Sequence, residues 1–122
     1  MNRLADVAFS TLHGIPVAHI TGEIDASNAS RLQRTVLDHV DNSDTGLVID
    51  LTATTYMDSA GTRLLYEISQ RLNHRSQALR VAVPATSPIR RILEITKLDT
   101  LIAVDDTAQH AAETLTSPPH AD

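Results

Sequence analysis

The chain contains no cysteine and very few aromatic residues: no tryptophan, one phenylalanine and two tyrosines among 122 residues. Without cysteine the protein has no disulfide framework, no thiolate nucleophile and no cysteine-ligated metal site, so its fold must depend on packing alone. Scarce aromatic rings leave few platforms on which the bases of single-stranded nucleic acids could stack. These absences argue against a disulfide-stabilised scaffold and against a binder of single-stranded nucleic acid.

Positive charge is also scarce and dispersed along the chain. The 10 Lys and Arg residues stand against 15 Asp and Glu residues, which gives a formal net charge of -5, and only Arg90 and Arg91 are adjacent in sequence. A nucleic-acid-binding surface needs a basic patch that neutralises phosphates. We therefore expect no direct nucleic-acid partner, whereas an acidic balance is compatible with protein partners.

Long hydrophobic runs are missing as well. Residues 1–20 lack the basic segment followed by an apolar stretch that marks a secretory signal. No segment approaches the roughly 20 consecutive apolar residues that a membrane-spanning helix needs. We therefore expect no membrane association and, by default, a cytoplasmic location.

Aliphatic residues supply nearly all the apolar content, and along the chain their spacing alternates between that of strands and that of helices. The length supports one core, hence a single domain. Strand patterns fall at 7–9, 15–20, 47–51, 79–83 and 101–104, and helical spacing falls at 29–40, 64–72, 89–97 and 108–115. This order predicts an α/β fold with a mixed, mostly parallel sheet of about five strands and about four helices. We assign residues 1–115 to this domain and residues 116–122 to a disordered tail.

Polar residues at the expected helix starts are candidate N-caps. Asp25 or Ser27 could cap the first helix, and Ser87 followed by Pro88 is a typical start of the third. A polar loop over residues 52–56 leads to Asp58 and Ser59, which places the Ser59 hydroxyl in solvent at the start of the second helix. By spacing alone, Asp58 or Ser59 is an ordinary cap that contributes about 1 kcal/mol.

Two short motifs at these helix starts suggest a more specific interpretation. Residues 55–61, Thr-Tyr-Met-Asp-Ser-Ala-Gly, resemble the signature of STAS domains, specifically of the bacterial anti-sigma factor antagonists. Residues 22–25, Gly-Glu-Ile-Asp, resemble the segment that opens the first helix of that family. The resemblance extends over residues 7–115 and implies a single STAS-like domain.

The resemblance also implies which residues form the site. Ser59 corresponds to the phosphorylated serine of the family, Asp58 to its acidic neighbour, and Asp25 to the adjoining loop surface. We therefore predict phosphorylation of Ser59 and partner binding by Asp25, Asp58, Ser59 and Gly61. Thr62 departs from the pattern, because the family usually has an apolar residue such as leucine there, and this leaves the choice of partner open.

The function implied is that of a binding protein and not of an enzyme. The resemblance implies an anti-sigma factor with serine kinase activity as the direct partner, a sigma factor as the indirect one, and a phosphatase that resets the switch. The chain lacks a Gly-rich loop ending in Gly-Lys-Ser/Thr that would hold ATP, so the phosphate must come from another protein. We predict no catalytic residues, no cofactor and no metal site.

Other functions explain the sequence less well, with one exception. A phospho-aspartate receiver could use Asp50 as its phosphate acceptor. Such a domain also needs an acidic pair after its first strand to hold magnesium and a lysine after its last strand, whereas Lys97 precedes the last strand here. A serine hydrolase would need Gly-x-Ser-x-Gly, which is absent, and the six histidines show no metal-binding spacing. A STAS scaffold, or a module that binds a nucleotide or another small ligand, stays open as the alternative.

Overall fold

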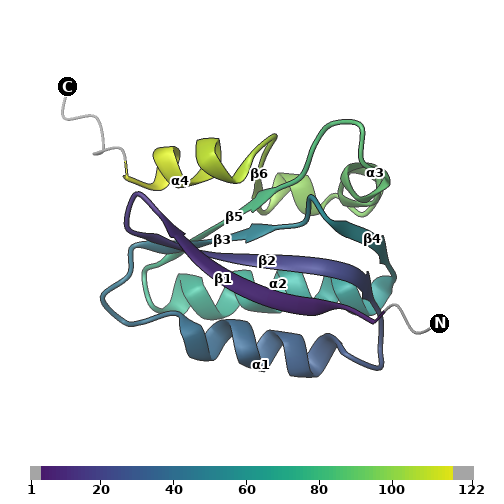
Figure 1. Cartoon of the computed structure of the whole chain (residues 1–122), viewed down its shortest axis with the longest axis horizontal. Helices are drawn as coiled ribbons and strands as arrows, with labels where there is room; N and C mark the ends of the chain where they lie inside the picture. Colours follow the sequence, from purple (N-terminus) through teal and green to yellow (C-terminus); the bar gives the residue numbers. More distant parts are fainter. Residues whose placement is uncertain (1–3, 117–122) are drawn as a thin grey trace.

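The computed structural model describes residues 4–116 and consists of a twisted sheet with helices on both faces (Figure 1). The sheet has six strands within this range. They are β1 (Asp6–Leu12), β2 (Ile15–Ile24), β3 (Gly46–Asp50), β4 (Thr54–Met57), β5 (Ala78–Ala82) and β6 (Ala103–Asp105). The strand order is β1-β2-β3-β5-β6, with β4 pairing β2 off this path, and only β1 is antiparallel to its neighbour. The predicted mixed, mostly parallel sheet is confirmed.

Strand β4 was not expected from the sequence, which predicted a polar loop over residues 52–56. The reason lies in the length of β2. Residues 17–19 of β2 pair with β3, but its last residues extend beyond β3, where Ile24 pairs with Met57 of β4. The short β4 therefore satisfies backbone groups of β2 that would otherwise lie unpaired.

The helices within residues 4–116 form two layers around the sheet. They are α1 (Ala29–His39), α2 (Ser59–His74), α3 (Pro88–Ile95) and α4 (Ala108–Thr116), with a 3₁₀ turn, η1 (Leu98–Thr100). Helices α1 and α2 lie side by side on one face, α4 covers part of the opposite face, and α3 packs beside β4 (Figure 1).

The C-terminal elements differ slightly from the prediction. The last strand begins at Ala103, not at Leu101, because η1 ends at Thr100 and Leu101 follows as its C-cap residue in a helical conformation. Helix α4 includes Thr116, which the sequence assigned to the tail, and the rest of that predicted tail, residues 117–122, lies outside the described residues.

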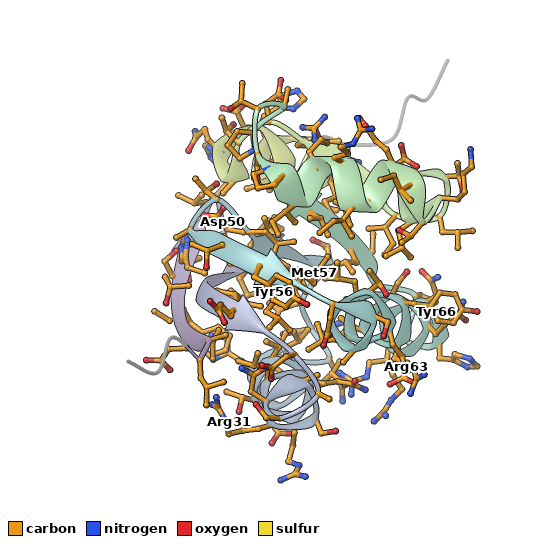
Figure 2. The ribbon with its side chains drawn as sticks, turned by 90° about the vertical axis from the view of Figure 1, so that its right-hand side faces the viewer. Arg31, Asp50, Tyr56, Met57, Arg63 and Tyr66 are labelled. Atoms are coloured by element: carbon orange, nitrogen blue, oxygen red, sulfur yellow. The ribbon has the colours of Figure 1, made fainter. Side chains whose placement is uncertain are left out.

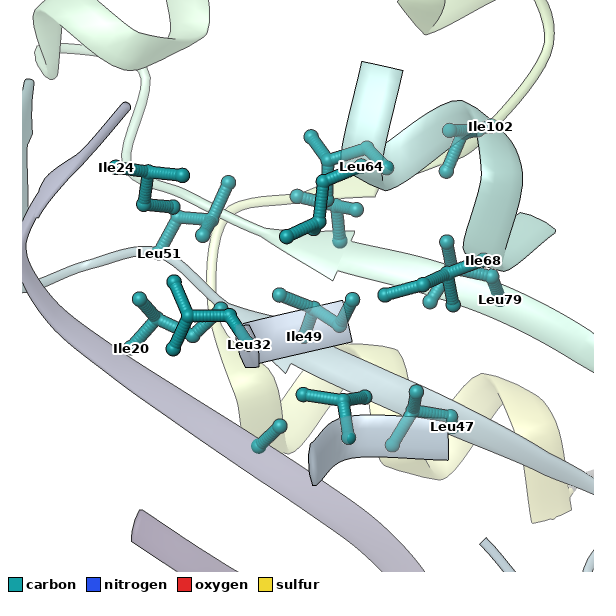
Figure 3. Packing of buried hydrophobic residues seen from close by; sticks show 14 of the residues in the cluster. Ile20, Ile24, Leu32, Leu47, Ile49, Leu51, Leu64, Ile68, Leu79 and Ile102 are labelled. Carbon is teal, nitrogen blue, oxygen red and sulfur yellow. The ribbon is translucent and has the colours of Figure 1, made fainter. Parts of the chain in front are cut away.

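The larger part of the core lies between the sheet and the pair α1–α2. Leu32 of α1 and Leu64 and Ile68 of α2 are fully or almost fully buried against Ile20 and Ile49 of the sheet (Figure 3). A smaller cluster on the opposite face joins the sheet to α4; its members are Ile15, Val17, Val48, Ala82, Ala111 and Ala112. Because both faces are covered, β3 is apolar without alternation, as the sequence predicted.

A buried carboxylate ties the last strand to its surroundings. Asp105 of β6 accepts hydrogen bonds from Arg80 of β5 at 2.8 and 3.2 Å and contacts Nδ1 of His110 on α4 at 3.0 Å. Burial by itself would raise the pKa of the Asp105 carboxyl, but hydrogen bonds and positive charge from Arg80 and His110 outweigh it and hold that pKa below its ordinary value of 3.8. The ionised carboxylate is therefore the form that stabilises the fold.

We expect Asp105→Asn to lower the free energy of unfolding by about 1 to 3 kcal/mol at neutral pH, because charge-assisted hydrogen bonds to Arg80 are lost. The unfolded chain regains the ordinary pKa of 3.8. As the pH falls below that value, the unfolded state binds the proton first, and the stability that the carboxylate contributes decreases until the pH has passed the lowered pKa of the folded state. The free energies of unfolding of the original protein and of Asp105→Asn therefore converge at acidic pH. Urea unfolding at neutral and acidic pH measures both effects.

The matched control for this substitution is the neighbouring carboxylate. Asp106 pairs with Arg90 at 2.8 Å, but its side chain is 75% exposed. Asp106→Asn should therefore cost less than about 1 kcal/mol. An Asp105→Asn protein as stable as Asp106→Asn at neutral pH would contradict the role given to the buried ion pair.

Candidate functional site

The predicted site lies where β2 and β4 end and where α1 and α2 begin. Ile24 and Met57 are register partners at these strand ends, and the next residue, Asp58, donates its backbone N–H to the carbonyl oxygen of Ile24 at 3.3 Å. Figure 2 views this end of the molecule and shows Tyr56 and Met57 on β4, with Arg63 on α2. The two loops that carry Asp25 and Ser59 therefore leave the sheet side by side.

Ser59 is the first residue of α2, and its side chain is exposed. The cap is formed by Asp58, whose Oδ1 accepts the backbone N–H of Ala60 at 2.8 Å and that of Gly61 at 3.4 Å. Within residues 4–116 the Ser59 hydroxyl has no hydrogen-bond partner. Because Asp58 performs the capping, the Ser59 hydroxyl is free for chemistry at the surface.

The neighbouring loop is held by Asp25 and Asn28. The Asp25 carboxylate accepts the backbone N–H of Ser27 at 2.9 Å, and the side chain of Asn28 accepts the backbone N–H of Asp25 at 3.1 Å and donates to the Glu23 carbonyl at 2.8 Å. The residue at the N-cap position of α1 is Asn28, so the prediction of Asp25 or Ser27 was wrong. Asn28 is buried, and its side chain bonds to two backbone groups of the loop, Asp25 N–H and the Glu23 carbonyl. These contacts hold Asn28 at the start of α1.

Gly61 lies in the first turn of α2 but beneath the surface. A Cβ atom added there would come within 2.0 Å of Met57 Cγ and 3.3 Å of Ile24 Cγ2. Glycine is therefore required for α2 to start this close to the strand ends. Its contact with a partner stays a prediction, and what the structure shows is its close packing against Met57 and Ile24.

Thr62 departs from the family pattern without disturbing the helix. It is half-buried, and its hydroxyl donates to the Ser59 carbonyl at 2.9 Å. This bond satisfies a group of the first turn locally, so the polar side chain costs little there.

Two further residues at this end were not singled out from the sequence. Tyr56 is 50% exposed on β4, and Arg63 is exposed one helical turn after Ser59. Tyrosine and arginine are the residue types enriched in protein–protein interfaces. Tyr56 belongs to the motif at residues 55–61. Its exposure was not predicted, because it results from the position of Tyr56 in β4, a strand that the sequence did not indicate.

A hydrogen-bonded chain that the sequence did not indicate crosses three strands. Ser10 Oγ lies 2.7 Å from His19 Nε2, and His19 Nδ1 lies 2.8 Å from Asp50 Oδ2. The order Ser–His–Asp is also that of hydrolases, which need in addition donors that stabilise an oxyanion. Here the polar groups satisfy one another across β1, β2 and β3, and Asp50 also accepts a hydrogen bond from the backbone N–H of Thr52.

Residues 4–116 contain no group of three or more His, Cys, Asp or Glu side chains arranged to hold a metal ion. Over the same residues, none of the helices combines the length and apolar character that crossing a bilayer requires.

The fold and the site together define a class of protein: a small α/β domain that presents a free serine hydroxyl at a helix start, beside a second exposed loop. The STAS domain model matches residues 6–111. The chain belongs to the STAS domain family, as the two motifs indicated.

Individual relatives agree with this assignment. Anti-sigma-F factor antagonist RsfB of Mycobacterium tuberculosis is 30% identical over 100 residues, which cover 81% of this chain and 80% of the relative. The crystal structure of an anti-sigma factor antagonist from Mycobacterium paratuberculosis superposes with a TM-score of 0.81 at 25% identity, covering 93% of this chain and 95% of the other.

The same fold also occurs in a different context. The crystal structure of a sulfate transporter family protein from Wolinella succinogenes gives a TM-score of 0.71 at 18% identity, covering 87% of this chain and 90% of the other. This similarity concerns the fold alone, so the function has to be argued from the site.

Proposed function

We propose that this protein is an anti-sigma factor antagonist whose binding is switched by phosphorylation of Ser59. In the unmodified state it binds an anti-sigma factor through the end that carries Asp25, Asp58 and Ser59, and a sigma factor is released. The observation that carries the proposal is the exposed Ser59 hydroxyl without a hydrogen-bond partner among the described residues, because Asp58 has taken the capping role. The names of the relatives at 30% and 25% identity support it.

A phosphate on Ser59 should leave the fold nearly unchanged. It adds about -1.5 to -2 charges and three acceptor oxygens at the first residue of α2. The helix dipole favours negative charge there by only about 0.3 to 1 kcal/mol at an exposed position. The added group meets solvent and not the core, because the Ser59 side chain is exposed.

A docked partner responds much more strongly to the same phosphate. Two unit charges about 4 Å apart interact by about 4 kcal/mol at an effective dielectric constant of about 20. Each ~1.4 kcal/mol changes affinity tenfold. A phosphate that faces a carboxylate of the partner, or that is buried without donors, therefore dissociates the complex while the domain stays folded.

The phosphate must come from a kinase, and we assign this role to the anti-sigma factor itself. The chain has no phosphate-binding loop of the Gly-Lys-Ser/Thr type. A phosphatase would then restore the binding state. In this scheme the antagonist supplies a binding surface and an acceptor hydroxyl, and it catalyses no step.

The decisive experiment combines the purified protein with ATP and the anti-sigma factor. We expect one phosphate per chain, located on Ser59 by peptide mass spectrometry, and loss of the complex afterwards in size-exclusion chromatography. Ser27, another exposed serine at this end, supplies the matched control: Ser27→Ala should still be modified, whereas Ser59→Ala should not. Stable binding without modification would instead favour a scaffold, and absence of binding would favour a small-ligand module.

A further inference from the structure

The first turns of α2 carry a cation without an internal partner. Arg63 is exposed, and within residues 4–116 it makes no hydrogen bond or ion pair. Other arginines are engaged: Arg80 binds Asp105, Arg90 binds Asp106, and Arg31 donates to the Ala5 carbonyl. Arg34, Arg71, Arg75 and Arg91 are also exposed and unpaired among the described residues, but Arg63 is the one that lies one helical turn from the proposed switch serine.

Arg63 lies on the same helical face as Ser59, four residues further along α2. Residues at this spacing have Cβ atoms about 5 to 6 Å apart, within reach of an arginine and a phosphoserine. Arg63 also lines a hollow of about 170 Å³ between α1 and α2, bordered by Ala26, Ala29 and Ala60. The hollow leaves space beside the guanidinium on the side of the loop that contains Ala26.

Two acidic side chains at this end are hydrogen-bonded within the domain. The Asp58 carboxylate caps α2, and the Asp25 carboxylate accepts the Ser27 N–H. Glu67, one turn beyond Arg63, lines the same hollow but makes no ion pair with it. Arg63 is thus a cation that this surface offers a partner beside Ser59, although the neighbouring carboxylates keep their negative charge and the chain as a whole carries a net charge of -5.

We propose that Arg63 alternates between two anions: a carboxylate of the anti-sigma factor when Ser59 is unmodified, and the phosphate on Ser59 when it is phosphorylated. This inference rests on the proposed function and adds the chemistry of the partner surface, which presents an acidic side chain to Arg63. Arginine binds both carboxylate and phosphate oxygens in bidentate geometry, so the two states compete for one group. Phosphorylation thus adds a repelling charge and also withdraws the cation that the partner used.

The pairing within the chain can be tested without kinase or partner. Phosphoserine is incorporated at position 59 during translation, and its second ionisation is followed by ³¹P NMR in the original protein, in Arg63→Ala and in Arg71→Ala. Arg71 is the matched control, because it is exposed and unpaired on the same helix but two turns further along. We expect Arg63→Ala to raise the pKa of the phosphate by about 0.3 or more. Arg71→Ala should not move it, and equal pKa values in all three proteins would overturn the pairing.

The partner's acidic contact is tested by charge reversal in the unmodified protein. Arg63→Glu should weaken binding of the anti-sigma factor by about tenfold or more, and Arg71→Glu by no more than about twofold. Unchanged thermal unfolding of both variants excludes a folding defect. If Ser59→Asp disrupts binding but Arg63→Glu does not, the inference about Arg63 falls and the proposed switch stands. If neither substitution affects binding, both fall.

Discussion

Ser59→Asp is expected to weaken binding of the anti-sigma factor by about tenfold or more, whereas Ser59→Ala should bind as the unmodified protein does. The aspartate introduces a permanent negative charge where the structure has a neutral, exposed hydroxyl. Because the Asp58 carboxylate already caps α2, a second carboxylate is not needed by the helix and projects toward the partner. Alanine removes the phosphate acceptor without adding charge, so it should fix the binding state.

Isothermal calorimetry with the purified anti-sigma factor measures both affinities. Thermal unfolding provides the control for the fold, and we expect both variants to unfold close to the original protein, since surface substitutions usually change stability by less than about 0.5 kcal/mol. Equal affinity of Ser59→Asp and Ser59→Ala would reject the electrostatic switch. A large loss of affinity in Ser59→Ala would instead show that the hydroxyl itself is a required contact.

Leu64→Ala should lower the free energy of unfolding by about 2 to 5 kcal/mol, the range observed when a large core side chain is truncated. Leu64 is only 1% exposed and belongs to the core between α2 and the sheet. Its removal leaves a cavity that the surrounding side chains can fill only in part. Chemical denaturation with urea or guanidinium measures the loss.

Leu101 provides the matched control for this substitution, because the same residue type is there 64% exposed. Leu101→Ala should change stability by less than about 0.5 kcal/mol. Under conditions in which Leu64→Ala stays folded, it should still accept phosphate on Ser59, since Leu64 lies below the surface. A protease-resistant Leu64→Ala protein that cannot be phosphorylated would contradict this separation of core and switch.

The pattern of apolar residues was sufficient for most of the fold. Residues 47–51 predicted a strand buried on both faces, and the spacing of Leu64, Ile68 and Leu72 predicted the buried face of α2, both of which the structure contains. Strand β4 could not be predicted in this way, because only four residues form it and two of them are exposed. Its formation depends on unpaired backbone groups of β2, a residue range about 30 positions earlier.

For the candidate site, the sequence predicted the position of the serine but not the hydrogen bonds around it. The motif located Ser59, but Asp58 and Ser59 were equally good caps by sequence, and the hydrogen bonds to Ala60 and Gly61 assign the cap to Asp58. The sequence offered Asp25 or Ser27 as the cap of the preceding helix, but the structure places Asn28 at the N-cap. Such choices are made by burial and by distant partners, which neighbouring residues do not encode.

The sequence by itself determined the order of the helices and of every strand except β4 within the described residues, and it determined the family, because hydrophobic periodicity and short motifs are local properties of the chain. Only the tertiary structure decided which polar groups are hydrogen-bonded within the domain and which have no partner there. Asp58 and Asp25 are bound within the domain, Gly61 is buried, and the Ser59 hydroxyl and the Arg63 guanidinium have no partner among the described residues. The physical reason is that hydrogen bonds and ion pairs are satisfied between segments far apart in sequence, once the core has brought those segments together.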